Sequence, residues 1–221
     1  MAKSLKAVEH DIGGLIVKRV LPHQEKRMVG PFIFFDQMGP GEFPAGEGIN
    51  VRPHPHIGLS TLTYLFEGAI LHRDSLGNHI EIMPGDVNWM TAGKGIVHSE
   101  RETFEVRANS HAISGIQCWV ALPEHMAELE PTFSQVKKHD LPHLMHEGVM
   151  MRLVVGEAYG LSSPVKTYWP MFYIDVAAPK GSTIEKPFAD QETAIFVVTG
   201  EITVDGTSYS SGDFVLLADD D

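Results

Sequence analysis

Residues 51–68 have the sequence VRPHPHIGLSTLTYLFEG, which places His54 and His56 two positions apart at the start of an apolar segment. In a β-strand, residues i and i+2 point to the same face, so the two imidazoles project together. Pro53 and Pro55 flank them and lack a backbone N–H, which confines this part to a sheet edge, a strand start or a bulge. The stretch therefore predicts a strand that presents a pair of histidines to one side.

The sequence around this stretch continues as short alternating apolar segments separated by Gly, Pro, Asn and Asp. Such segments, at a spacing of roughly 8–12 residues, are typical of an all-β sandwich or barrel. Residues 74–79 (DSLGNH) and 204–208 (VDGTS) have the composition of hairpin turns. Residues 123–131 (PEHMAELEP) could form one or two helical turns, but proline at both ends favours a linker. We therefore predict an all-β fold.

A repeat divides the chain into two halves. The segment 61–94, with its apolar strand, Gly-Asp pair and second strand, is echoed by a shorter segment at 193–220. Two copies of one β-unit predict two similar barrels in tandem, at 1–122 and 146–221, joined by a linker at 123–145. The second copy stops soon after its Gly-Asp pair. Either the second barrel takes strands from elsewhere or the chain is a shortened form of something longer, and the sequence leaves both alternatives open.

The composition limits the partners and the location of the protein. The chain has 221 residues and a formal net charge of −12, so direct binding to a phosphate backbone is not expected, whereas a basic protein partner is compatible. The single cysteine, Cys118, excludes an intrachain disulfide, and we expect it to be buried. The N-terminus has no apolar leader and no segment approaches ~20 apolar residues. We expect a soluble monomer in the cytoplasm, or in the nucleus of a eukaryote, without membrane association.

A second pair of potential ligands follows about forty residues after the first. Residues 92–101 (AGKGIVHSER) repeat the i, i+2 arrangement with His98 and Glu100. Two such pairs on neighbouring strands would bring three imidazoles and one carboxylate to one point. This donor set suits Fe, Mn, Co, Ni, Cu or Zn, and open positions beside it are typical of non-heme Fe(II) sites. A single H-x-H pair is more often structural, so the hypothesis depends on the two pairs meeting.

The other histidines lack such a partner. We expect His72 and His79, which flank a hairpin turn, to be exposed, and His111 to be a core or rim residue. A further three, His139, His143 and His146, lie in the polar linker.

The motifs around both pairs resemble the two signatures of the cupin family. The spacing Gly48-x5-His54-x-His56 fits the first signature, although Thr61 stands where most cupins have a glutamate. The second signature is met in part, with His98 two positions late. Together with VGPFIFFDQMGP (29–40), these stretches are similar to pirins, which are two-barrel cupins. The resemblance is long and specific from about residue 12 to 123 and looser beyond.

The resemblance implies a single metal, usually iron as Fe(II), in the N-terminal barrel, bound by the residues corresponding to His54, His56, His98 and Glu100. It also implies a metal-free second barrel, in which the ligand positions fall on Pro187 and Ala189. The implied chemistry is flavonol oxidation of the quercetin 2,3-dioxygenase type, with O2 as co-substrate and Glu100 as general base. A set of apolar residues could stack on a flat aromatic substrate, although each is more often a core residue: Phe34, Phe43, Phe66, Trp89, Met90 and Trp119.

A second function is compatible with the same ligands. Pirins are also described as non-enzymatic regulators that bind a protein partner, with the oxidation state of the metal controlling the surface. An open apolar channel to the metal would favour the oxygenase, and a charged outer patch would favour the regulator. A purely structural metal is a third alternative, which is disfavoured because such sites commonly use cysteine ligands.

Overall fold

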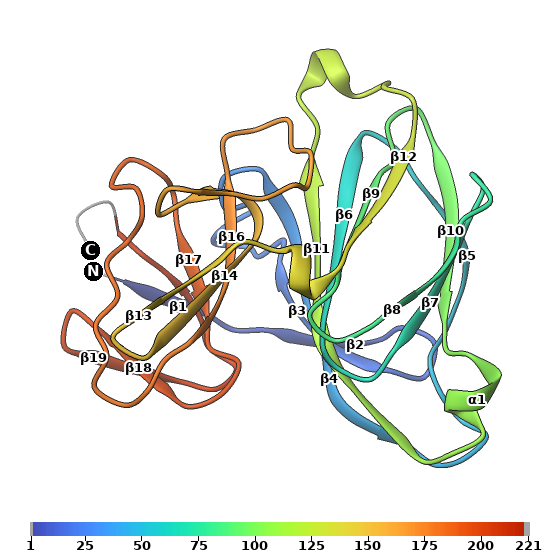
Figure 1. Cartoon of the computed structure of the whole chain (residues 1–221), viewed down its shortest axis with the longest axis horizontal. Helices are drawn as coiled ribbons and strands as arrows, with labels where there is room; N and C mark the ends of the chain where they lie inside the picture. The colour runs from blue at the N-terminus through green and yellow to red at the C-terminus, as the bar shows by residue number, and fades with distance from the viewer. Residues whose placement is uncertain (1, 219–221) are drawn as a thin grey trace.

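The computed structural model describes residues 2–218, and nearly all of its regular structure is β-strand, as predicted. Figure 1 shows two β units side by side, with the green strands of the first half in one and the orange and red strands of the second half in the other. Helices are short: α1 spans Phe104–Arg107, and the 3-10 turns η1 and η2 span Glu124–Met126 and Lys138–Asp140. Within residues 2–218, no helix has the length and apolar character needed to cross a membrane.

The N-terminal unit is built from two antiparallel sheets. One has four strands in the order β5-β10-β7-β8, and the other has seven in the order β12-β9-β6-β11-β4-β3-β2. A hydrogen bond from Gln117 on β11 to Glu100 on β10 shows that the two sheets face each other. The strands are β2 Val8–Asp11, β3 Ile16–Leu21, β4 Phe32–Phe43, β5 Asn50–His56, β6 Leu59–Glu67, β7 Ile70–Asp74, β8 His79–Ile82, β9 Val87–Thr91, β10 Ile96–Arg101, β11 His111–Ala121 and β12 Thr132–Val136.

Strands β6 and β9, in the middle of the seven-stranded sheet, are buried on both faces. Leu62 on β6 and Cys118 on β11 are fully buried in a core that also contains Phe214 of the C-terminal unit. Thr63, which follows Leu62, and Gln117, which precedes Cys118, are hydrogen-bonded to each other on the opposite face, where Gln117 also reaches β10. The alternation of the strands therefore supplies one face to the interior of the first unit and one to the second unit. The burial of Cys118 confirms the prediction.

The C-terminal unit takes a strand from the beginning of the chain. Its strands are β1 Lys3–Leu5, β13 His143–His146, β14 Val149–Ala158, β15 Leu161–Ser162, β16 Phe172–Ala177, β17 Ala194–Phe196, β18 Glu201–Val204, β19 Thr207–Ser210 and β20 Phe214–Leu216. Strand β1 pairs antiparallel with β20, with Ser4 opposite Val215. A borrowed strand, one of the two alternatives above, is therefore present. The predicted turn between β18 and β19 is also found, with Asp205 at φ 49° and Gly206 at φ 76°.

Part of the expected linker belongs to the sheets. Strand β12 lies inside the segment 123–145 and pairs along its length with β9, so that Phe133 is opposite Met90 and Gln135 is opposite Asn88. Phe133 packs on the small apolar cluster that contains Met90, and Gln135 Nε2 donates to Asn88 Oδ1 at 3.0 Å. Alternating contacts of this kind hold an extended segment as an edge strand. A polar linker is therefore an incomplete description of these residues.

Candidate metal centre

The two sequence pairs lie on neighbouring strands. Strands β5 and β10 are antiparallel, with His98 directly opposite His54 and Ile96 opposite His56. This register turns the three imidazoles to the same face, and their ring nitrogens lie within 4.8 Å of one another. The closest approach is 3.1 Å, between His56 Nε2 and His98 Nε2. The three histidines thus converge as the alternation predicted, and they could hold a metal ion.

Glu100 lies beside this group and is held by a different residue. The register between β5 and β10 shifts between His98 and Glu100, as at a β-bulge, and the Glu100 side chain is buried. Gln117 on β11 donates from Nε2 to both carboxylate oxygens, at 3.0 Å to Oε1 and 3.2 Å to Oε2. Among the described residues, the group of mutually close ligand atoms contains the three histidines and not this carboxylate. The structure therefore brings three of the four expected ligands together and clamps the fourth next to them.

The surroundings keep the two buried rings neutral. Burial, together with the neighbouring His98 and His54, lowers the pKa of His56 to about 4. Burial and the adjacent His54 and His72 lower the pKa of His98 to about 3. A neutral imidazole keeps one unprotonated nitrogen, and this is the form that binds metals. The electrostatics of the site fit a cation and oppose additional protons.

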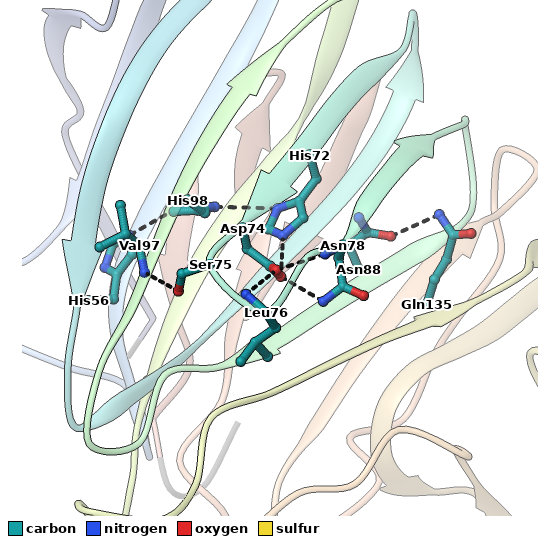
Figure 2. A network of polar contacts seen from close by, with 10 residues as sticks. All are labelled: His56, His72, Asp74, Ser75, Leu76, Asn78, Asn88, Val97, His98 and Gln135. Atoms are coloured by element: carbon teal, nitrogen blue, oxygen red, sulfur yellow. Dashed lines mark hydrogen bonds and ion pairs between the residues drawn. The ribbon is translucent and has the colours of Figure 1, made fainter.

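His72 was expected to be exposed, and this prediction is wrong. Its side chain is 3% exposed, and its ring stacks on Phe133 with a centroid separation of 4.4 Å. His72 Nδ1 lies 3.3 Å from His98 Nδ1, and His72 Nε2 lies 3.0 Å from an oxygen of Asp74 (Figure 2). The sequence carried a signal, because His72 shares the parity of the fully buried Ile70 on the same strand. The expected exposure of His79 is found.

Asp74 is the end of this network and the start of the β7–β8 hairpin turn. Its side chain is fully buried. Oδ1 accepts from the backbone N–H groups of Leu76 and Asn78, and Oδ2 accepts from the Asn78 side chain and contacts His72. Burial acts to raise the pKa of Asp74, but the hydrogen bonds from His72 and Asn78 outweigh it, so the pKa lies below its ordinary value. Asp74 is therefore an ionised acceptor with four donors around it.

Aromatic residues form one wall beside His56. Phe34 and Trp119 stack with their centroids 4.0 Å apart, and the Trp119 ring meets His56 edge-on at 5.0 Å. The indole Nε1 of Trp119 is buried and has no hydrogen-bond partner among residues 2–218. Of the other proposed rim residues, Phe66 and Trp89 belong to the core shared with the second unit, because their strand faces point to it, and Phe43 belongs to another apolar cluster. Met90 packs with Phe133, the ring that stacks on His72. His111, expected at the core or rim, is partly buried, and its Nε2 lies 3.1 Å from Glu102 Oε1.

Comparisons with a family model and with known proteins indicate the same family. The sequence model described as Pirin matches residues 14–120. A "Pirin-like protein" of Caulobacter vibrioides is 46% identical over 212 residues, which cover 94% of this chain and 73% of that protein. A Pseudomonas aeruginosa protein named "Putative quercetin 2,3-dioxygenase" is 38% identical over 94% of this chain and 64% of its own length. This chain thus spans less than two thirds of that relative.

A solved structure shows the same architecture. The crystal structure titled as quercetin 2,3-dioxygenase from Acinetobacter baumannii superposes with a TM-score of 0.84 and 34% sequence identity. The match covers 98% of this chain and 71% of that chain. The shared fold is the two-barrel cupin arrangement, with the candidate metal centre in the first barrel. By sequence and by structure, this chain belongs to the pirin family.

Proposed function

We propose that this chain binds one divalent transition metal, most naturally Fe(II), through His54, His56, His98 and Glu100, and that it is a dioxygenase acting on flavonols. The observation that carries the proposal is the convergence of three imidazoles whose nitrogens lie within 4.8 Å. Two Nε2 atoms at 3.1 Å can share only one proton between them, whereas a cation would use both lone pairs. The donor set therefore fits the metal that the family implies, and the dioxygenase names of two similar proteins support the reaction class.

The metal and the residues around it have separate roles in the proposed reaction. A divalent metal held there would supply Lewis acidity toward an enol or phenol oxygen and the redox chemistry that reaction with O2 requires. Glu100 is the buried carboxylate beside the imidazoles, so it is the group that takes the hydroxyl proton of a flavonol. In the metal-free chain, Gln117 holds this carboxylate beside the imidazoles by donating to both of its oxygens. The ring opening then requires O2 as the second substrate and a flavonol that is correctly oriented beside the site.

The aromatic wall formed by Phe34 and Trp119 would orient the substrate and exclude water from the site. Phe34 and Trp119 offer an apolar surface next to His56, of the kind on which a flat polyphenol packs. The unpaired Trp119 N–H supplies a donor for a carbonyl or hydroxyl oxygen of the substrate. A flavonol carries both an extended aromatic surface and such oxygens, and this combination is what the wall selects.

Oxygen uptake with quercetin tests the proposal. The full chain is reconstituted anaerobically with Fe, Mn, Co, Ni or Cu, and O2 consumption is followed after quercetin is added. We expect turnover with at least one metal, a large loss in Glu100→Gln, and full activity in His79→Gln, which changes an exposed histidine of the same unit. Metal binding without turnover for all five metals would reject the enzyme and favour the second candidate below.

A pocket on the outer side of the metal-bearing sheet favours the regulatory alternative. Its volume is about 280 Å³, and its charged lining residues are Arg73 of β7, Arg101 of β10, Arg107 of α1 and one carboxylate, Glu102. Phe104, at the rim, is 82% exposed. Three arginines around an exposed aromatic ring, on a chain of net charge −12, suit an acidic segment of a protein partner that also carries an apolar side chain.

Peptide binding tests this second candidate. Fluorescence anisotropy would follow a labelled peptide rich in Glu with one aromatic residue. The regulator hypothesis expects binding that Arg101→Glu abolishes, that Lys18→Glu on the exposed part of β3 leaves unchanged, and that differs between reduced and oxidised metal. Equal, weak binding to all three proteins would reject this pocket as a partner site.

A further inference from the structure

We propose that His72 and Asp74 are positioning residues, which fix the His98 ring in the tautomer whose Nε2 lone pair faces His54 and His56. The proposal deepens the metal site proposed above and rests on it for its consequence in metal binding. It concerns residues that lie outside the expected ligand set. The contacts run in a row from the hairpin turn to the site, from Asp74 through His72 to His98 and then to His56 (Figure 2).

The direction of the first contact follows from Asp74. Its carboxylate accepts from the backbone N–H groups of Leu76 at 2.9 Å and Asn78 at 3.1 Å, and from Asn78 Nδ2 at 2.8 Å. An ionised carboxylate can only accept hydrogen bonds. The 3.0 Å contact between Asp74 Oδ2 and His72 Nε2 is therefore a hydrogen bond in which His72 Nε2 carries the proton.

The second contact follows from the first. A neutral imidazole with its proton on Nε2 has an unprotonated Nδ1, which can only accept. The neighbour of His72 Nδ1 is His98 Nδ1 at 3.3 Å, so His98 must donate from Nδ1. The remaining nitrogen of His98, Nε2, is then unprotonated, and it is the atom that lies 3.1 Å from His56 Nε2. The ionised Asp74 thus determines the tautomer of His72, and His72 in turn determines the tautomer of His98.

The positions of His72 and His98 are fixed by strand pairing on one side and by the Phe133 ring on the other. In the pairing of β7 with β10, Asp74 is opposite His98, which fixes the spacing of the two strands at this point. Ser75 in the turn accepts a hydrogen bond from the backbone N–H of Val97, the residue before His98. The opposite face of His72 is covered by the Phe133 ring of β12. The His72 ring therefore has little freedom to tilt or to exchange its nitrogens.

A role in packing alone would not need this arrangement. A buried aromatic ring at position 72 would stack on Phe133 equally well without any polar atom, and would not require a buried carboxylate to satisfy it. Outer hydrogen-bond partners of metal-binding histidines fix the tautomer and the orientation of the ring, and their loss typically weakens metal binding by about 10–100-fold. We expect an effect of this size when the His72–His98 contact is removed.

The test reads the tautomer in metal-free protein and the metal affinity separately. Nitrogen-15 NMR of histidine-labelled full chain at neutral pH distinguishes protonated from unprotonated ring nitrogens. In the wild type we expect His98 to be protonated at Nδ1 and bare at Nε2. In His72→Phe, which keeps the stacked ring but removes both polar atoms, we expect a mixture of tautomers. Competition of Co²⁺ against a chromophoric chelator should show about 10–100-fold weaker binding.

Two further variants make the result decisive. His72→Gln offers an oxygen to His98 and an N–H to Asp74, so it should restore the wild-type tautomer and most of the affinity. His79→Phe, the same substitution at an exposed histidine of β8, should change neither. If His72→Phe does not fold, as judged by its amide spectrum, Asp74→Asn takes its place, with the same expectation of mixed tautomers.

Protonation of His98 at Nε2 in the wild type would overturn the inference, as would an unchanged tautomer in the folded His72→Phe variant. Because the tautomer is read without metal, its outcome is independent of the proposed metal site. A wild type that binds no Co²⁺ but shows the expected tautomer would refute the proposed function and leave the positioning role of His72 intact.

Discussion

The clamp on Glu100 yields a prediction in which stability and metal affinity change in opposite directions. In Gln117→Met the side chain keeps its length but loses the amide that donates to both carboxylate oxygens, at 3.0 and 3.2 Å. A hydrogen bond to a charged group contributes about 1.5–3 kcal/mol, and the shared donor counts as one such bond. We therefore expect the metal-free variant to be less stable by about 2 kcal/mol, which lowers Tm by about 4–8 °C for a chain of this size.

With metal bound, we expect Gln117→Met to lower the free energy of unfolding by less than it does in the metal-free protein. If Glu100 is a ligand, it exchanges Gln117 for the cation, so the lost amide matters less in the bound state than in the free state. By linkage, the difference appears as tighter metal binding, up to about tenfold for 1.4 kcal/mol. Urea unfolding without metal and chelator competition with Co²⁺ measure the two quantities. Metal affinity that is unchanged or weaker in Gln117→Met, despite the loss of stability, would refute the assignment of Glu100 as a ligand.

Three other variants test separate parts of the structure. The double change His56→Ala with Glu100→Ala should reduce the metal content of untagged protein from about one ion per chain to none, and retained metal would contradict the site. Tyr64→Phe removes the 2.8 Å hydrogen bond to Asp175 that joins the two units, and urea unfolding should show a loss of about 1–2 kcal/mol. Gly206→Ala meets no atom within 4 Å but sits at φ 76°, so calorimetry should show a loss of about 1 kcal/mol from the backbone alone, and no loss would contradict the turn.

The sequence was sufficient for the part of the site that depends on local alternation. The i, i+2 spacing placed His54 and His56 on one face, and the same spacing placed His98 with them once the strands were neighbours. Glu100 entered through the family resemblance as much as through spacing. Its actual contact, Gln117, comes from a strand of the opposite sheet, and no local pattern connects the two residues.

His72 shows where local reasoning fails. Residues beside a hairpin turn are usually exposed, and the prediction followed this rule. The burial of His72 depends on Phe133, about sixty residues later in the sequence, in a strand that had been interpreted as linker. The parity with Ile70 contained part of the answer, but only the crossing of β12 over the site turns an inward-pointing histidine into a buried one.

The second unit has a physical role in the site even without a ligand of its own. Along β11, Gln117 faces Glu100, while Cys118 is fully buried against residues of the second unit. If that unit were absent, Leu62, Tyr64 and Cys118 would face water, at a cost of about 1.5–3 kcal/mol for each large apolar side chain. The strand that presents Gln117 to the metal centre is thus stabilised by packing on its other face. Because the two faces alternate residue by residue, the same strand packs on the second unit with one face and presents Gln117 to the site with the other.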